Sequence, residues 1–298
     1  MRVGLFGTGY WAAETQGAAL AAHPKVKLVG VWGRDPAKAA TLAQRYGTRA
    51  YTDVDELIAD VDAIAVALPP DVQAGIALRA AEAGRHLLLD KPLALTVEDA
   101  DRVVAAVERT GVASVVFFTN RFYGNVAEFL DRTAVTGGWH GSRATMFASI
   151  FHPGNPYGAS PWRREKGGLW DIGPHALSII LPVLGPVTEV AAVDGPRDAV
   201  HLVLRHAGGA STTMSLTLDA PPEARSFDFA FWGDTGVAVV PRGDGTQVAA
   251  FTAAIDQLLV DLGAGVPANP CDVRFGREVV AVLAAAESAR AQRRTVTI

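Results

Sequence analysis

The stretch at the amino terminus is the feature that most constrains the fold. A short apolar run, Val3–Phe6, leads at once into the turn Gly7-Thr8-Gly9, and an Ala-rich helical pattern follows as far as His23. A strand, a glycine turn and a helix in this order are typical of a dinucleotide-binding unit, and Ala12 stands in the third glycine position. The sequence therefore predicts a nucleotide-binding fold that starts with the first strand.

The predicted turn has the backbone chemistry that a pyrophosphate needs. Gly7 permits a tight turn, and Gly9 lets the backbone approach the phosphates closely. The helix that begins at about Tyr10 then offers amide hydrogens to an anion. We expect the phosphate contacts to come from Gly7, Thr8, Gly9, Tyr10 and Trp11.

Two patterns divide the 298 residues. Through residue 118, strand-like apolar runs alternate with helical patterns, which indicates an α/β fold: a Rossmann domain with a doubly wound parallel sheet. From 119 to 298, successive strand-like runs have no helices between them, so we expect an α+β domain with a largely antiparallel, open-faced sheet. The predicted strands of this second domain are Ser142–Ile150, Val187–Asp194, Ala199–Arg205 and Ala210–Asp219.

Composition excludes several classes of function. A formal net charge of −4 without a long basic run argues against a nucleic-acid partner. The single cysteine, Cys271, excludes an internal disulfide and a cysteine-rich metal site. No apolar stretch approaches the length of a bilayer span, and the first residues lack a signal-peptide pattern, so we expect a cytoplasmic protein without a membrane partner.

The end of the second predicted strand bears on the choice of cofactor. An NAD-specific site usually has a carboxylate there for the adenosine ribose, but the corresponding position is Gly33. Asp35 precedes Pro36, a pattern that indicates a helix cap. Arg34 offers a guanidinium to a 2′-phosphate, so the sequence favours NADP over NAD.

A carboxylate and an imidazole stand four residues apart in Gly167-Gly168-Leu169-Trp170-Asp171-Ile172-Gly173-Pro174-His175. Pro174 is tolerated in a first helical turn, so we expect a helix to begin near Gly173 and His175 to lie in its first turn. Neutral imidazole is favoured there, and with a carboxylate in reach it suits a general base. The alternative is that Asp171 caps the helix and His175 is a core histidine.

The chain resembles the Gfo/Idh/MocA family of glucose–fructose oxidoreductases and inositol dehydrogenases. The motifs that carry the resemblance run in order: Gly7-Thr8-Gly9, Leu68-Pro69-Pro70, Leu89-Asp90-Lys91-Pro92-Leu93, Asn120-Arg121-Phe122, Trp162-Arg163, Gly167 to His175, and Ala286-Glu287-Ser288-Ala289-Arg290. The resemblance implies an NAD(P)-dependent oxidoreductase that acts on sugars, cyclitols or related alcohols. It also implies a cis peptide bond before Pro92.

The resemblance assigns roles to individual residues. It implies that Lys91, Asp171 and His175 are catalytic, with the lysine beside the substrate hydroxyl and the histidine as acid/base. The expected cofactor contacts beyond the glycine turn are Gly33, Arg34, Leu68, Pro69, Pro70, Gln73, Asp90 and Lys91. Two of these depart from the family pattern, which commonly has Glu at position 90 and often His at position 73.

The predicted second domain should supply the substrate pocket and the subunit contacts. The stretch Phe151–Lys166 leads into Asp171 and carries aromatic and arginine side chains that suit a polyhydroxylated substrate. The expected substrate contacts are Arg121, Tyr157, Trp162, Arg163 and Trp170. His152, Asp171 and His175 could suggest a metal site. We expect none, because no third ligand stands at short sequence spacing and the nicotinamide reaction needs no metal. The family's open sheet face implies a homodimer or homotetramer.

A carbonyl reductase for non-sugar substrates is not excluded by any sequence feature, and two further alternative functions fit the same fold. One is an enzyme that retains its cofactor and uses transient oxidation to drive elimination or glycoside cleavage. The other is a non-catalytic NAD(P)-binding regulator, which would have no need of the three candidate catalytic residues.

Overall fold

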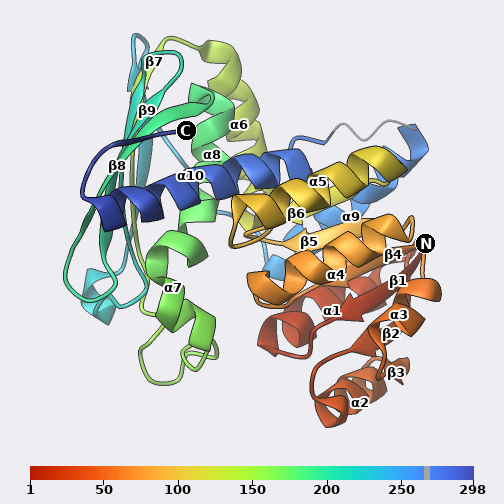
Figure 1. Ribbon diagram of the computed structural model, residues 1–298. Coiled ribbons are helices and arrows are strands. Elements are labelled where there is room, and N and C mark those ends of the chain that lie inside the picture. The colour runs from red at the N-terminus through yellow and green to blue at the C-terminus, as the bar shows by residue number, and fades with distance from the viewer. Residues whose placement is uncertain (265–268) are drawn as a thin grey trace. The chain divides into compact units, whose positions relative to one another are not determined.

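The structure is a computed structural model that describes residues 1–264 and 269–298. The chain divides into two compact units: residues 1–122 with 245–277, and residues 123–244 with 278–298 (Figure 1). The predicted boundary between residues 118 and 119 lies four residues before the first crossing, at Phe122. The sequence did not predict that residues 245–277 return to the first unit.

The first unit contains a six-stranded sheet in the order β3-β2-β1-β4-β5-β6. Every strand pair in it is parallel, which confirms the predicted Rossmann architecture. The strands are β1 (Arg2–Phe6), β2 (Lys27–Trp32), β3 (Arg49–Tyr51), β4 (Ala63–Val66), β5 (His86–Asp90) and β6 (Ser114–Phe117). The central strands read as continuous apolar runs because both faces of the sheet are covered. β3 is only three residues long, and the sequence did not indicate it.

The helices of this unit begin and end at residues with recognisable chemistry. They are α1 (Gly17–Ala22), α2 (Pro36–Arg45), α3 (Val54–Ala59), α4 (Pro70–Glu82), α5 (Val97–Thr110) and α9 (Gln247–Ala264), with a π-helical turn at Ala12–Gln16 and a 3-10 turn at Thr119–Phe122. The Asp35 carboxylate accepts the amides of Ala37 and Lys38 at 3.0 and 3.3 Å, which confirms it as the cap of α2.

Helix α9 brings the returning segment into the first unit. Its buried Phe251 packs edge-on against Phe117 of β6, with ring centroids 4.9 Å apart. Such aromatic contacts add to the apolar burial that holds the helix on the sheet.

The second unit contains a seven-stranded mixed sheet in the order β12-β11-β7-β10-β9-β8-β13. Its strands are β7 (Trp139–Phe147), β8 (Val187–Asp194), β9 (Val200–His206), β10 (Ser211–Thr217), β11 (Ser226–Gly233), β12 (Gly236–Val239) and β13 (Val296–Thr297). Among the described strands of this second sheet, only β7 and β10 pair in parallel, so the sheet is largely antiparallel, as predicted. β7 begins three residues before the predicted start, Ser142.

Helices cover one face of this sheet (Figure 1). They are α6 (Gly124–Thr136), α7 (Pro161–Asp171), α8 (Gly173–Leu184) and the carboxyl-terminal part of α10 (Val273–Gln292), and a 3-10 turn spans Pro222–Ala224. Along β9, Leu202 and Leu204 are buried while Val203 and Arg205 are exposed. This alternation shows that the other face of the sheet is open.

One stretch among the described residues, Pro161–Leu184, has the length and apolar character of a membrane span. Of its apolar 18-residue window, 78% is buried inside the fold. It consists of α7 and α8, and α7 is itself interrupted at Gly167. We interpret it as core structure of the second unit.

A buried histidine joins three elements of the second unit. His206, which is 1% exposed, has Nδ1 2.8 Å from the Gly185 carbonyl and Nε2 3.0 Å from the Thr212 hydroxyl. The Thr212 hydroxyl lies 2.7 Å from that of Ser142. Neutral imidazole satisfies this arrangement, donating from Nδ1 and accepting at Nε2. Burial lowers the pKa of His206 below its ordinary value of 6.5.

The free energy of unfolding should therefore fall as the pH drops below about 6.5. The unfolded chain takes up the His206 proton first, so stability is lost between the ordinary pKa and the lower folded pKa. For one group the slope is at most about 1.4 kcal/mol per pH unit. Urea unfolding of His206→Gln at pH 7.5 and 5.5 should show a smaller pH dependence than the unmodified protein. His201→Gln, at an exposed position of β9, is the control and should leave it unchanged. An equal slope in His206→Gln would contradict this assignment.

Candidate cofactor and reaction sites

The turn after β1 lies against both neighbouring strands. The Gly7 amide donates to the Trp32 carbonyl of β2 at 2.8 Å. Gly7 has φ 134°, and a Cβ there would lie 2.4 Å from the Ala67 carbonyl oxygen that follows β4. Only glycine fits such a position. A Cβ at Gly9 would meet nothing within 4 Å, so the turn leaves open space beside its backbone.

A single edge of the sheet carries most of the predicted cofactor residues. β2, β1, β4 and β5 are consecutive neighbours, and all run in the same direction. The predicted residues at their carboxyl ends therefore lie along this edge: Gly7, Thr8, Gly9, Gly33, Arg34, Leu68, Pro69, Asp90 and Lys91. Ligands of doubly wound sheets bind at this edge. Pro70 begins α4 and is buried.

The helix after the glycine turn begins at Tyr10, as predicted. Tyr10 is exposed, whereas the Trp11 ring packs toward Phe117, with centroids 6.3 Å apart. The amino terminus of a helix carries the positive end of the helix dipole, which favours an anion there.

The end of β2 has no room for a carboxylate side chain at position 33. A Cβ on Gly33 would lie 2.5 Å from Cγ2 of Thr8, in the glycine turn. Arg34 follows and is exposed. The only carboxylate nearby in sequence, Asp35, accepts the amides at the start of α2.

Gln73 has a structural role that the sequence did not predict. Its side chain is 1% exposed, and the amide is occupied by the backbone that carries Lys91. Nε2 donates to the carbonyls of Asp90, Pro92 and Leu93 at 2.7, 3.0 and 3.3 Å, and Oε1 accepts the Asp90 amide at 2.9 Å. Its hydrogen-bonding groups thus face the protein, and the cofactor contact of this residue stays a prediction.

Asp90 also holds the lysine's backbone. Its Oδ1 accepts the Lys91 amide at 2.8 Å. The Lys91-Pro92 peptide bond is cis, as the resemblance implies. Lys91 itself is partly exposed. The backbone that carries it is held by the side chains of Gln73 and Asp90.

In the second unit, the Asp171–His175 motif spans the junction of two helices. α8 begins at Gly173 with Pro174 in its first turn, which confirms the predicted start. The His175 amide donates to the Ile172 carbonyl at 3.1 Å, and the imidazole is partly buried. Asp171 ends α7, and Ile172 occupies the cap position. The alternative role of Asp171 as the cap of α8 is therefore wrong.

Asp171 is paired with an arginine. Nε of Arg163 donates to its Oδ2 at 3.0 Å, and the side chains of the two residues are 20% and 8% exposed. The Arg163 guanidinium also lies over the rings of Tyr157 and Trp162, 4.9 and 4.8 Å from their centroids. The structure thus joins three of the predicted substrate residues to a predicted catalytic one.

The other two predicted substrate residues have different settings. Trp170 is fully buried, so its ring is part of the core of the second unit, and its substrate contact stays a prediction. Arg121 belongs to the first unit, where its guanidinium lies 5.8 Å from the centroid of Phe275. Among the described residues, no group of three or more His, Cys, Asp or Glu side chains could hold a metal ion.

Sequence reasoning missed the Arg163–Asp171 pair and the backbone contacts of Gln73. Residues eight apart do not meet on a regular helix, so nothing in the spacing pairs Arg163 with Asp171. The Gly167-Gly168 doublet was the one available signal of a break between them.

The fold and the glycine turn define a dinucleotide-binding Rossmann protein with a second α+β unit. Comparison with known protein families gives the same two parts. Residues 1–118 match the family described as "Oxidoreductase family, NAD-binding Rossmann fold", and residues 132–239 match the GFO/IDH/MocA C-terminal domain. The protein belongs to the Gfo/Idh/MocA family, as its sequence motifs suggested.

Curated relatives include enzymes with named substrates. A dTDP-3,4-didehydro-2,6-dideoxy-alpha-D-glucose 3-reductase from Streptomyces antibioticus is 32% identical over 195 residues, which are 64% of this chain and 59% of that relative. The chain thus matches less than two thirds of that relative's length. Inositol 2-dehydrogenase from Rhizobium meliloti (strain 1021) is 28% identical over 229 residues, covering 72% of this chain and 68% of the relative.

Solved structures share the fold over the whole chain. GenD2 from gentamicin A biosynthesis, in complex with NAD, has a TM-score of 0.87 at 22% identity and covers 100% of this chain and 96% of its own. A putative myo-inositol dehydrogenase from Sinorhizobium meliloti 1021 has a TM-score of 0.85 at 22% identity, with coverage of 100% and 99%.

Replacing Gln73 should destabilise the first unit. Gln73→Ala leaves the Asp90 amide and buried carbonyls without their partner, so we expect the free energy of unfolding to fall by about 2–3 kcal/mol. Urea unfolding followed by circular dichroism measures it. Gln44→Ala, on the exposed side of α2, is the matched control and should change stability by less than about 0.5 kcal/mol. A similar small effect for Gln73→Ala would contradict the assigned role.

Proposed function

We propose that this protein is an NAD(P)-dependent oxidoreductase that transfers a hydride between the nicotinamide and a sugar, a cyclitol or a related alcohol or ketone. The observation that carries the proposal is the arrangement of the first unit. The glycine turn after β1 and Lys91 after β5 lie at the same carboxyl edge of one parallel sheet. A dinucleotide bound across that edge is the arrangement that such sheets favour.

The first unit has the groups to hold the cofactor. The Gly7–Gly9 turn and the amides at the start of the following helix would receive the pyrophosphate, with the open space beside Gly9 supporting a close approach. When bound, the nicotinamide supplies the hydride acceptor or donor.

Removal of a hydride from an alcohol also requires removal of the hydroxyl proton. We assign His175 as the acid/base that moves this proton and Lys91 as the cation that stabilises the developing alkoxide. Asp171 would orient the site, and its pairing with Arg163 supports a fixed position for its carboxylate. In the reverse direction the same groups return the proton to the alkoxide.

The proposed substrate class rests on chemistry and on the relatives. Aromatic rings beside an arginine suit a polyhydroxylated molecule, and the partly exposed Tyr157, Trp162 and Arg163 form such a cluster. The relatives include a reductase of a deoxysugar nucleotide and an inositol dehydrogenase. We therefore assign the second unit to substrate binding.

The second unit would also supply contacts between subunits. The open face of its sheet exposes Val193 and Val203 among polar side chains. We propose a homodimer or homotetramer assembled through this face.

A substrate screen tests the function. Polyols and keto-sugars should be oxidised or reduced with one of the two nicotinamide cofactors, and absorbance at 340 nm measures the turnover.

Lys91→Ala should lower kcat about a hundredfold or more, because it removes charge stabilisation in the transition state, while cofactor affinity changes little. Lys38→Ala, an exposed lysine of α2, is the control and should retain full activity. Near-normal turnover in Lys91→Ala would contradict the assigned role. Tightly retained cofactor without net redox turnover would favour the elimination or glycoside-cleaving alternative.

The expected cofactor preference is NADPH over NADH. Gly33 supplies no carboxylate to the ribose, and the exposed Arg34 can pair with a 2′-phosphate. Arg34→Ala should weaken NADPH binding about tenfold or more and leave NADH binding within about twofold. Fluorescence titration with both cofactors measures the two Kd values. Equal or tighter binding of NADH by the unmodified protein would refute the preference.

A further inference from the structure

Helix α7 is broken between the two residues of the Arg163–Asp171 pair. Gly167 has φ 61° and ψ −161°, so the backbone leaves the helical conformation there and resumes it at Gly168. On an unbroken helix, residues eight apart are separated by about 12 Å along the axis. The break is therefore what lets the Arg163 side chain reach the Asp171 carboxylate at 3.0 Å.

Asp198 holds this break from the turn between β8 and β9. Its Oδ2 accepts the amides of Gly168 and Leu218 at 3.1 and 2.8 Å. Its Oδ1 accepts the Asp219 amide at 3.1 Å and the Thr217 hydroxyl. Charge-assisted bonds of this kind are stronger than neutral ones, so one carboxylate joins the break in α7 to the end of β10.

The backbone at the break is pressed against the sheet. A Cβ at Gly168 would lie 3.0 Å from both N and Cα of Thr217, so a larger residue would push the segment off β10. On the other side, a Cβ at Gly167 would lie 3.4 Å from Cβ of Asp198. Sheet and carboxylate together leave the break little freedom.

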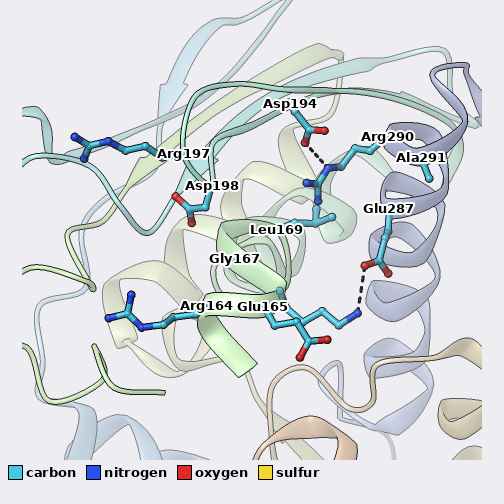
Figure 2. Close-up of a pocket in the computed structure, with 11 residues that line it drawn as sticks. Arg164, Glu165, Gly167, Leu169, Asp194, Arg197, Asp198, Glu287, Arg290 and Ala291 are labelled. Atoms are coloured by element: carbon cyan, nitrogen blue, oxygen red, sulfur yellow. Dashed lines mark hydrogen bonds and ion pairs between the residues drawn. The ribbon is translucent and has the colours of Figure 1, made fainter. Parts of the chain in front are cut away.

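The surroundings of Asp198 offer an internal comparison. Figure 2 shows a pocket of about 420 Å³ lined by charged side chains, with Asp198 beside Gly167. On its rim Asp194 pairs with Arg290 at 2.6 Å. That pair joins β8 to α10 at an exposed position, where an ion pair contributes little to stability. Among the acidic residues that line this pocket, Asp198 is the one whose described hydrogen bonds reach the break.

A series of backbone hydrogen bonds leads from Asp198 to His175. The Gly168 amide donates to Asp198, and the Gly168 carbonyl accepts the Ile172 amide at 3.0 Å. The Ile172 carbonyl in turn accepts the His175 amide at 3.1 Å. Asp171 lies inside the turn that Gly168 and Ile172 close. Both candidate catalytic residues of the second unit thus stand on backbone that Asp198 anchors.

We propose that Asp198 is a positioning residue for Asp171 and His175, acting through Gly168 and without touching the substrate. The inference rests on the proposed function for the roles of those two residues. Displacement of catalytic groups by a fraction of an ångström to 1 Å lowers turnover strongly, whereas it need not weaken the binding of a cofactor held by the first unit.

The test compares Asp198→Asn with Asp194→Asn. In Asp198→Asn, an amide NH₂ replaces one acceptor oxygen and faces a donor, so the segment should loosen. We expect kcat to fall about tenfold or more, with KM for the alcohol and Kd for the cofactor within about twofold of the unmodified values. Hydrogen exchange measured by mass spectrometry should be faster in the peptide containing residues 168–172. Asp194→Asn should change neither kcat nor this exchange.

The outcomes separate the inference from the proposed function. Faster exchange with unchanged kcat, or an equal loss of kcat in Asp194→Asn, would overturn the positioning role while the proposed function stands. If the unmodified protein oxidises and reduces nothing in the screen, the proposed function fails. In that case unchanged exchange in Asp198→Asn overturns the anchoring as well.

A second variant covers failure of Asp198→Asn to fold. Thr217→Val removes one of the four donors to the Asp198 carboxylate with little change of shape. It should lower kcat by at least about twofold and speed hydrogen exchange in residues 168–172, both less than Asp198→Asn does. No change in either measurement would overturn the proposal.

Discussion

The close approach of the glycine turn to two strands is the constraint on which the first unit depends. The Gly7 amide bonds to the end of β2, and its Cα lies against the carbonyl that follows β4. A side chain at this position would separate β1 from β4, the pair at which the order of the parallel sheet reverses direction. The open edge proposed for the cofactor is therefore a consequence of how tightly the central strands and the turn pack.

The same solution recurs in both units, where a polar side chain bonds mainly to backbone amides and carbonyls. Gln73 holds the segment that carries Lys91, and Asp198 holds the segment that leads to Asp171 and His175. Backbone donors and acceptors exist whatever residue stands at a position, so such anchors fix the path of the chain. The backbone that carries the side chains proposed to do chemistry is thereby held in place.

Much of the first unit could be predicted because its central strands are buried on both faces and read as apolar runs. β3 is too short to show a pattern, and the return of residues 245–277 depends on long-range packing that local sequence does not encode. The sequence indicated no helix in residues 151–166, which contain several prolines. One of them, Pro161, begins α7, because the amide hydrogen that proline lacks has no acceptor in the first turn of a helix. Nothing local marks Asp198, since its partners are Gly168 and residues of the β10 end.

The Arg163–Asp171 pair shows why the broken helix is better explained by function than by stability. Both side chains are largely removed from solvent, and the desolvation of two charges offsets much of their attraction. A continuous helix with an apolar residue at position 171 would avoid that cost and keep the hydrogen bond lost at Gly167. The chain instead maintains a left-handed glycine, a carboxylate anchor and an arginine stacked between two aromatic rings around one carboxylate. Such restriction of the backbone and side chains is expected where the orientation of a carboxylate, here that of Asp171, matters to a reaction.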